Sequence, residues 1–183
     1  KVVAIEKRRH VNGREVLSVV IENDYKDTED TSMTAYEDYS KLSNDQIIDI
    51  IREAGIVGMG GATFATNVKA ATSMEKVKTL IANACECEPY ITSDDMLLRM
   101  FPDRVLEGMR IICQVLNPER VVLAIEENKK EAIEVLKKEL VNDKQIELVV
   151  LPTRYPQGAE KQLVQAVTGS EIPGGELPRS VGA

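Results

Sequence analysis

The chain opens with two segments in which apolar and polar residues alternate, the pattern of half-buried β-strands. These segments cover residues 2–9 and 15–21, and between them stand Asn12 and Gly13, the pair most typical of a tight hairpin turn. We therefore expect a β-hairpin within residues 1–23. Because a two-stranded hairpin is marginally stable in water, we expect it to belong to a larger sheet whose other strands precede this chain.

The next segment, residues 24–42, is acidic and rich in small polar residues without periodicity, which indicates a linker. A helix is predicted to begin at Ser43, because Gln46 three residues later completes a capping box. Its isoleucine-rich apolar face ends at Gly55, a residue typical of helix C-termini. Residues 43–183 are expected to form one domain.

Within that domain, apolar strand-like runs alternate with amphipathic segments of helical period. Strands are expected over residues 77–84, 121–125 and 146–151, and helices over residues 93–116, 129–141 and 158–167. Pro102 predicts a kink or a break in the helix that contains it. Strands joined by helices pair in parallel through right-handed crossovers. The fold class predicted is α/β, a layered Rossmann-like parallel sheet with helices on both faces.

Polar residues follow the end of each predicted strand, in segments 83–89, 126–128 and 153–158. The carboxyl ends of parallel strands lie along one edge of a sheet, and ligands of open α/β sheets bind there, near a reversal of strand order. The sequence therefore places a candidate binding site at this edge.

A glycine cluster, which includes Gly55, Gly58, Gly60 and Gly61, follows the first helix and precedes Lys69. A dinucleotide fingerprint has the order strand, glycines, helix, and a P-loop ends in Gly-Lys-Ser/Thr, so neither standard motif applies. One interpretation is a phosphate held by backbone N–H groups and Lys69. The alternative is a tight connection followed by a solvated helical lysine.

In the acidic turn, Glu86 and Glu88 alternate with Cys85 and Cys87. In extended backbone the carboxylates would point to one side and the sulfur atoms to the other. Carboxylates on one face suit hydrogen bonds to ribose hydroxyls or to an amide. The alternative is a solvated turn with the cysteines as small buried hydrophobic residues, a role that is also favoured for Cys113.

The last motif combines Tyr155, Gly158 and Glu160 at the start of the last predicted helix. It suits a ring stacked on Tyr155 and a polar group held by Glu160. The alternative is a proline-bounded loop with an acid in the first helical turn, where the helix dipole favours negative charge. Together with the other strand ends, the motif favours a nucleotide or flavin pocket.

Composition narrows the possible functions of these 183 residues. A net charge of −7 argues against a nucleic-acid groove, which needs clustered Lys and Arg. Three cysteines and one histidine are too few for a four-cysteine iron–sulfur or zinc site, and free thiols are expected. No apolar run reaches the roughly 18 residues of a membrane span. Because the chain begins with lysine rather than methionine, we expect it to be part of a longer protein.

Three groups of residues, in order along the chain, resemble one known family. They are Gly58, Gly60, Gly61, Phe64, Thr66 and Lys69, then Asn83, Glu86, Glu88 and Pro89, and finally Tyr155, Gly158 and Glu160. Their order and spacing resemble the flavin- and NADH-binding 51 kDa subunit of respiratory complex I. Segments 86–92, 125–129 and 155–158 are more specifically similar to the C subunit of Rnf-type ion-translocating electron transport complexes.

The resemblance implies an NAD(H)-dependent flavin oxidoreductase that passes electrons between NAD(H) and iron–sulfur carriers, such as ferredoxin, through noncovalent FMN. It implies a subunit that is peripheral on the cytoplasmic side of the cell membrane, held there by the other subunits of the complex. Residues 1–23 are similar to the last hairpin of an N-terminal barrel-sandwich domain. A further flavin-binding segment and the 4Fe-4S clusters are expected only after the last residue of this chain, which we therefore expect to be inactive alone.

The resemblance also implies roles for individual residues. FMN contacts are expected from Gly58, Gly60, Gly61, Lys69, Asn83, Cys85 and Gly158, and contacts around the nicotinamide nucleotide from Phe64, Glu86, Glu88 and Glu160, with Tyr155 near the ring. No side chain is expected to act as a nucleophile or to carry a proton, and no metal ligands are expected.

Two alternatives remain open on the sequence. Cobalamin reductases of bacterial microcompartments share this domain and its cofactors. A noncatalytic scaffold module would keep the fold alone, and the replacement of a family aspartate by Cys85 and of a family glutamate by Ala159 favours that alternative.

Overall fold

The computed structural model describes residues 1–29, 31–32, 35–36, 38–59, 63–74 and 77–183. The chain divides into two compact units, Lys1–Tyr36 and Glu37–Ala183. Each unit is described by itself.

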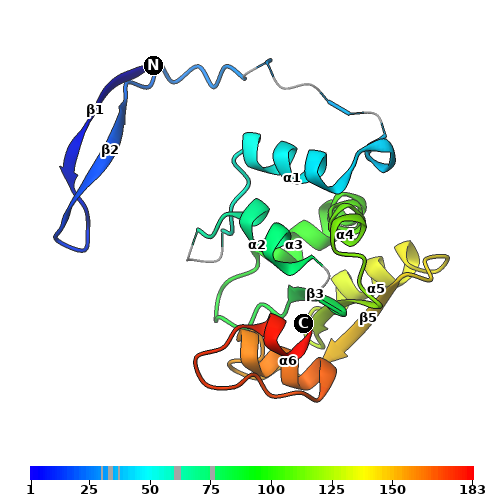
Figure 1. The fold of residues 1–183 in the computed structure, drawn as a ribbon. Helices are drawn as coiled ribbons and strands as arrows, with labels where there is room; N and C mark the ends of the chain where they lie inside the picture. The colour runs from blue at the N-terminus through cyan, green and yellow to red at the C-terminus, as the bar shows by residue number, and fades with distance from the viewer. Residues whose placement is uncertain (30, 33–34, 37, 60–62, 75–76) are drawn as a thin grey trace. The chain divides into compact units, whose positions relative to one another are not determined.

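The first unit is the predicted hairpin (Figure 1). Strand β1 (Val2–Arg9) pairs in antiparallel register with β2 (Glu15–Ile21). Asn12 closes the turn by accepting a hydrogen bond from the backbone N–H of Arg14, and Gly13 has a positive φ of 83° that favours glycine. Most side chains of both strands are exposed, so the hairpin has no core of its own.

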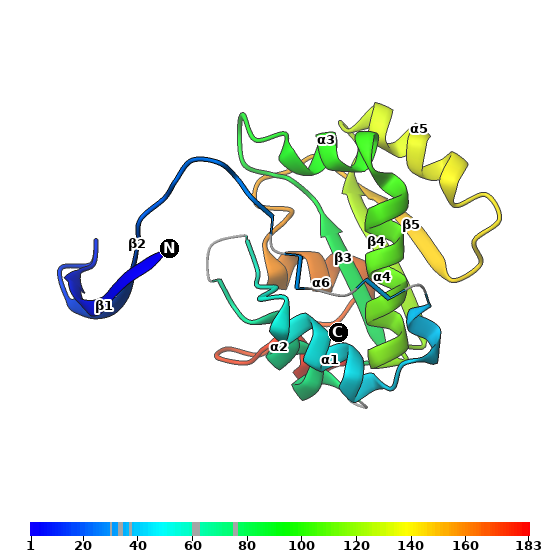
Figure 2. The ribbon, with the colours of Figure 1, turned by 90° about the horizontal axis from the view of Figure 1, so that it is seen from above.

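The second unit is built on a three-stranded parallel sheet in the order β3-β4-β5 (Figures 1 and 2). The strands are β3 (Thr79–Ala84), β4 (Arg120–Glu126) and β5 (Ile146–Leu151). The helices are α1 (Asn44–Glu53), α2 (Thr66–Ser73), α3 (Ser93–Met100), α4 (Pro102–Leu116), α5 (Lys130–Glu139) and α6 (Glu160–Thr168), with short 3-10 turns η1 (Tyr39–Lys41) and η2 (Pro178–Val181).

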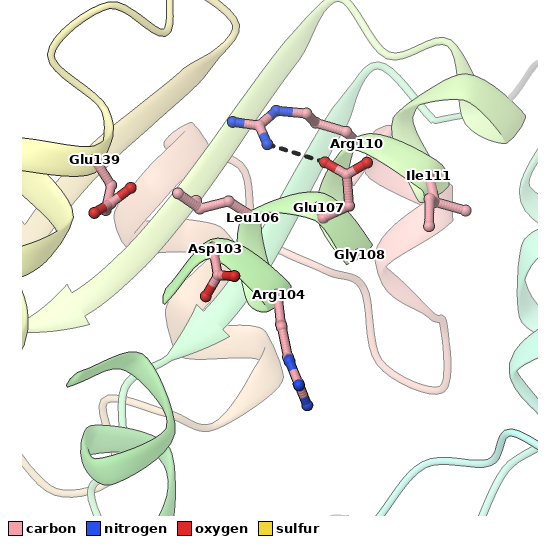
Figure 3. Close-up of a pocket in the computed structure, with 8 residues that line it drawn as sticks. All are labelled: Asp103, Arg104, Leu106, Glu107, Gly108, Arg110, Ile111 and Glu139. Atoms are coloured by element: carbon pink, nitrogen blue, oxygen red, sulfur yellow. Dashed lines mark hydrogen bonds and ion pairs between the residues drawn. The ribbon is translucent and has the colours of Figure 1, made fainter. Parts of the chain in front are cut away.

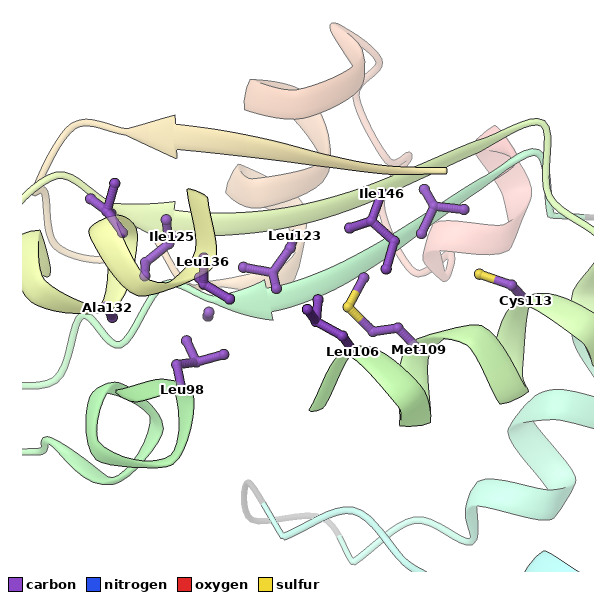
Figure 4. Close-up of a cluster of buried hydrophobic side chains, with 12 residues drawn as sticks. Leu98, Leu106, Met109, Cys113, Leu123, Ile125, Ala132, Leu136 and Ile146 are labelled. Atoms are coloured by element: carbon purple, nitrogen blue, oxygen red, sulfur yellow. The ribbon is translucent and has the colours of Figure 1, made fainter. Parts of the chain in front are cut away.

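Helices cover both faces of this sheet, as the central strand makes clear. Leu123 and Ile125 of β4 belong to the cluster formed with α3, α4 and α5, which Figure 4 shows beneath the sheet. The alternate residues, Val122 and Ala124, pack with Leu163 of α6 on the opposite face. Because successive side chains of a strand point to opposite faces, a strand buried on both sides is almost continuously apolar. The predicted layered α/β fold is confirmed.

A third layer attaches α1 and α2 to α4. Ile47 and Ile51 of α1 pack with Ala70 of α2 and with Val115 and Leu116 of α4. Helix α1 begins with the predicted capping box, in which the side chains of Ser43 and Gln46 each bond to the other's backbone N–H. This layer holds the start of the glycine loop against the domain.

The break predicted at Pro102 is confirmed, because Phe101 leaves the helical conformation and Pro102 starts α4. The structure differs from the sequence-based expectations in two places. Helix α2 was not predicted. Finally, the three described strands follow one another in chain order, so the site at their carboxyl ends does not lie at a reversal of strand order.

The described residues include no helix that is both long enough and apolar enough to cross a membrane.

Candidate functional site

A hollow of about 350 Å³ opens where the three parallel strands end, and we call it the strand-end pocket. Its wall comes from the segments that follow β3, β4 and β5 and from the turn before α3. The lining residues are Glu86, Cys87, Glu88, Tyr90, Ile91, Thr92, Glu126, Asn128, Lys129, Thr153, Arg154 and Tyr155. The edge predicted from the sequence is therefore concave, and it is lined mainly by polar and charged side chains.

Glu86 holds the pocket wall to helix α3. Its side chain is only 4% exposed, and it accepts hydrogen bonds from the backbone N–H of Asp94 at 2.9 Å and from Ser93 Oγ at 3.1 Å. Lys129, 11% exposed, donates to Oε2 of Glu86 at 3.0 Å. Burial acts to raise the pKa of Glu86, but these hydrogen bonds outweigh it and hold the pKa below its usual value. The carboxylate is thus fixed as an anion at a helix N-terminus.

Glu88 and Tyr155 meet across the pocket. The Tyr155 hydroxyl donates to Oε1 of Glu88 at 3.4 Å, and the tyrosine is 69% exposed. Both residues were predicted to lie near a nicotinamide nucleotide, and the structure brings them together although 67 residues separate them. An exposed aromatic ring beside a carboxylate offers a stacking surface and a hydrogen-bond acceptor.

Asn83 and Gly158 join the end of β3 to the loop before α6. The Asn83 amide donates to the carbonyl of Gly158 at 2.9 Å and accepts from the backbone N–H of Cys85 at 3.0 Å. A Cβ atom on Gly158 would stand 2.1 Å from the Cys85 carbonyl oxygen. Only glycine allows the two backbones to approach this closely.

The two cysteines of the acidic turn have different surroundings. Cys85 is buried, and its burial, with smaller effects of Glu126 and Cys87, raises the pKa of its thiol to about 12. Cys87 is half-buried and lines the strand-end pocket. The alternation of sulfur and carboxylate faces was expected for extended backbone, and the strand stops before this turn. Strand β3 ends at Ala84, and the following backbone turns with hydrogen bonds between residues two apart.

Glu126, the last residue of β4, is buried at the pocket and was not singled out from the sequence. It is 1% exposed, and its Oε1 has no hydrogen-bond partner within the described structure. Burial raises the pKa of Glu126 and the Glu86 carboxylate acts in the same direction, whereas the N–H of Arg154 and the ammonium of Lys129 act against them. The sequence placed it only within segment 126–128, one of the three polar segments at the ends of the predicted strands.

The glycine loop is closed at its base. Val57 and Ala65 form an isolated antiparallel bridge, and the N–H of Gly58 donates to the carbonyl of Phe64 at 2.8 Å. Phe64 is 56% exposed. Two further predicted contacts, Gly60 and Gly61, lie outside the described residues.

Lys69 and Glu160 are exposed on helices. Lys69 lies on α2, and Glu160 is the first residue of α6. Within the described parts of the chain, no hydrogen bond or ion pair joins the glycine loop and α2 to the strand-end pocket. The predicted site residues therefore form two groups, and their binding roles stay predictions.

Comparison with known proteins identifies the family of this second unit. Residues 51–183 match the family model described as the Nuo51 FMN-binding domain. The chain belongs to this family. The family expected from the motifs is confirmed.

Among known proteins, this chain is similar in sequence to the C subunits of ion-translocating oxidoreductase complexes. The chain is 44% identical over 183 residues to the C subunit of the Na(+)-translocating ferredoxin:NAD(+) oxidoreductase complex of Acetobacterium woodii, covering 100% of this chain and 41% of that protein. It is 45% identical over 184 residues to the proton-translocating counterpart of Clostridium ljungdahlii, covering 100% of this chain and 40% of that protein. The chain thus spans about two-fifths of the length of these relatives.

A solved structure supports the fold of the Nuo51-type domain. The crystal structure of an NAD+-reducing NiFe hydrogenase in the air-oxidized state superposes with a TM-score of 0.60, at 24% sequence identity. The match covers 70% of this chain and 24% of the hydrogenase chain.

A second and larger hollow, about 520 Å³, lies along α4 on the Nuo51-type domain and holds none of the predicted site residues (Figure 3). Both of its arginines are engaged with neighbours: Arg110 pairs with Glu107 at 3.2 Å and with Asp143 at 2.8 Å, and Arg104 lies over the ring of Phe101. The strand-end pocket, which collects the motif residues, is therefore the better candidate site.

Proposed function

We propose that this chain is the FMN- and NAD(H)-binding part of the electron-input subunit of an Rnf-type complex. In this role it passes electrons between NAD(H) and an iron–sulfur carrier such as ferredoxin. The observation that carries the proposal is a Nuo51-type domain whose motif residues Glu86, Glu88 and Tyr155 line a pocket at the carboxyl ends of the strands.

The residues present fit a flat cofactor with polar edges. The pocket volume of about 350 Å³ lies within the range of roughly 300–1,000 Å³ typical of small-molecule sites. Gly158 lets the loop before α6 lie directly against the backbone of Cys85 beside this pocket. Tyr155 adds an exposed ring.

Each group of residues then has a task. Asn83, Cys85 and Gly158 would contact the flavin ring, and Lys69, with the glycine loop that contains Gly58, Gly60 and Gly61, would bind the phosphate. Phe64, Glu88, Glu160 and Tyr155 surround the nicotinamide nucleotide. Glu86 acts by holding the pocket wall, since its carboxylate is occupied by α3 and Lys129.

FMN, when bound, supplies the chemistry of accepting a hydride and releasing single electrons. This chain's own residues orient the reactants and exclude water, and none needs to act as a nucleophile. In the whole subunit, 4Fe-4S clusters would receive the electrons. We place the subunit peripherally on the cytoplasmic side of the membrane, bound by the other subunits of the complex.

The proposal is tested by titrating FMN into the full-length subunit and, separately, into residues 1–183, with flavin fluorescence as the readout. Binding by the full-length subunit supports the proposal, and weaker or absent binding by residues 1–183 is expected because this chain spans only about two-fifths of the length of its relatives. Absence of FMN binding by a folded full-length subunit would contradict the proposal and favour a noncatalytic scaffold.

A further inference from the structure

Glu126 is a described residue whose carboxyl group is buried without a full set of hydrogen-bond partners. Its side chain is almost completely buried, with the residue 1% exposed, and it forms part of the lining of the strand-end pocket. Its Oε1 is the one buried side-chain oxygen or nitrogen in the described part of the chain that has no hydrogen-bond partner. A buried polar atom left unpaired destabilises the fold, so such an atom calls for a physical explanation.

The neighbouring charges indicate which form of Glu126 the fold favours. Two carboxyl groups, Glu86 and Glu126, share the surroundings of one ammonium group, Lys129. Lys129 makes its 3.0 Å ion pair with Glu86, so Glu126 receives a more distant attraction from Lys129, together with a hydrogen bond from the backbone N–H of Arg154. The nearby Cys85 thiol has a pKa raised to about 12, so it stays neutral and adds no charge beside Glu126. Burial raises the pKa of Glu126 as well, which favours the neutral acid.

A neutral carboxyl group has a distinctive hydrogen-bonding capacity. It offers an O–H donor and a carbonyl acceptor side by side, whereas a carboxylate only accepts. Its complement is a group with adjacent C=O and N–H functions, such as a primary carboxamide or the imide edge of a ring. Two parallel hydrogen bonds can then form at once.

We propose that Glu126 is a ligand-recognition residue of the strand-end pocket, where its carboxyl group pairs with an adjacent C=O and N–H edge of the bound ligand. This inference rests on the proposed function, which supplies two groups of that chemistry, the imide edge of the flavin ring and the carboxamide of nicotinamide. Occupation by either would satisfy the unpaired Oε1 and remove the cost of burying it.

The test uses the full-length subunit with Glu126→Met, an apolar side chain of similar length, and Glu126→Gln, whose amide keeps a donor and an acceptor side by side. Glu134→Gln is the matched control, because Glu134 is an exposed acid on α5 that pairs with Lys137. One arm titrates FMN into the apoprotein with fluorescence as the readout. The other titrates NAD+, which cannot reduce the flavin, into the FMN-loaded subunit, with the flavin absorbance spectrum as the readout.

We expect Glu126→Met to weaken binding by at least about tenfold in one arm, since the ligand edge loses its buried partner. Loss of FMN affinity assigns the contact to the flavin, and loss of NAD+ affinity alone assigns it to nicotinamide. Glu126→Gln and Glu134→Gln should keep affinities close to that of the unmodified subunit. Unchanged binding of both ligands by Glu126→Met would overturn the inference. Glu126 would then be a buried acid whose Oε1 is hydrogen-bonded to water.

A pH series decides the matter even if Glu126→Met does not fold. As pH rises through the pKa of Glu126, the acid loses its O–H donor, so the affinity of the unmodified subunit should fall. The charged groups nearest to Glu126, Glu86 and Lys129, are the same in Glu126→Gln, whose affinity should stay flat over that range. Identical pH profiles would overturn the inference. Failure of the unmodified subunit to bind either ligand would instead contradict the proposed function.

Discussion

Gly158 brings the loop before α6 against the end of β3, where no side chain has room. The Asn83 amide bonds to the Gly158 carbonyl across the same contact, so the glycine and the amide together hold the loop before α6 at the end of β3. The sequence singled out both residues, but only the fold reveals that Gly158 is required by the Cys85 carbonyl rather than by a turn.

Replacement of Gly158 by alanine should therefore separate the two segments. The added Cβ would lie 2.1 Å from the Cys85 carbonyl oxygen, and relief of such a clash typically costs about 1–3 kcal/mol. We expect a lower free energy of unfolding in urea and weaker FMN binding by the full-length subunit. The control is Gly174→Ala, because a Cβ there meets nothing within 4 Å. Equal effects of the two substitutions would contradict this role of Gly158.

The ionised form of Glu86 should contribute to stability in a pH-dependent way. The pKa of Glu86 is lower in the folded chain than its ordinary value of 4.5, so the contribution is fully present above that value and is lost as pH falls through the folded pKa. Glu86→Gln should lower the free energy of unfolding by about 1–3 kcal/mol at neutral pH, and the difference should shrink at acidic pH.

Urea denaturation of the unmodified and Glu86→Gln proteins over a pH series measures this difference. Glu134→Gln, which changes an exposed acid, should show a difference below about 0.5 kcal/mol at every pH. A Glu86→Gln difference that does not change with pH would show that the carboxylate charge plays no part.

Among the elements, those with strong local signals were predicted well. The capping box of α1, the break at Pro102 and the continuous apolar run of β4 are all found in the structure. Helix α2 was missed because its N-cap, Ala65, makes no side-chain hydrogen bond and only Ala70 of the helix is buried. A helix with neither a cap nor an apolar stripe leaves little trace in a single sequence.

The cap of α1 offers a test of how this helix supports the glycine loop. Ser43→Ala removes one half of the capping box and should lower the free energy of unfolding by about 1 kcal/mol. Ser73→Ala, at the C-terminal end of α2, is the control, because the Ser73 side chain makes no hydrogen bond in the described structure. Urea denaturation of the two variants measures the difference, and no loss for Ser43→Ala relative to Ser73→Ala would contradict the role of the cap.

On the scale of the whole molecule, the family and the sheet edge were predictable, but the contacts within the pocket were not. Segment 126–128 was placed at this edge, but the burial of Glu126 was not predicted, because it depends on segments that follow β3 and β5, which lie far from it in sequence. The pairing of Glu86 with Lys129 likewise joins residues 43 positions apart. Such contacts depend on the register of three strands, which a local pattern does not determine.

The central claim is that this Nuo51-type domain holds FMN where NADH can reduce it. The most direct measurement loads the full-length subunit with FMN, mixes it anaerobically with NADH and follows the visible absorbance of oxidised flavin. We expect the absorbance to be bleached, and bleaching to be impaired in Gly158→Ala but not in Gly174→Ala. Stable FMN binding with no bleaching by NADH would contradict the claim.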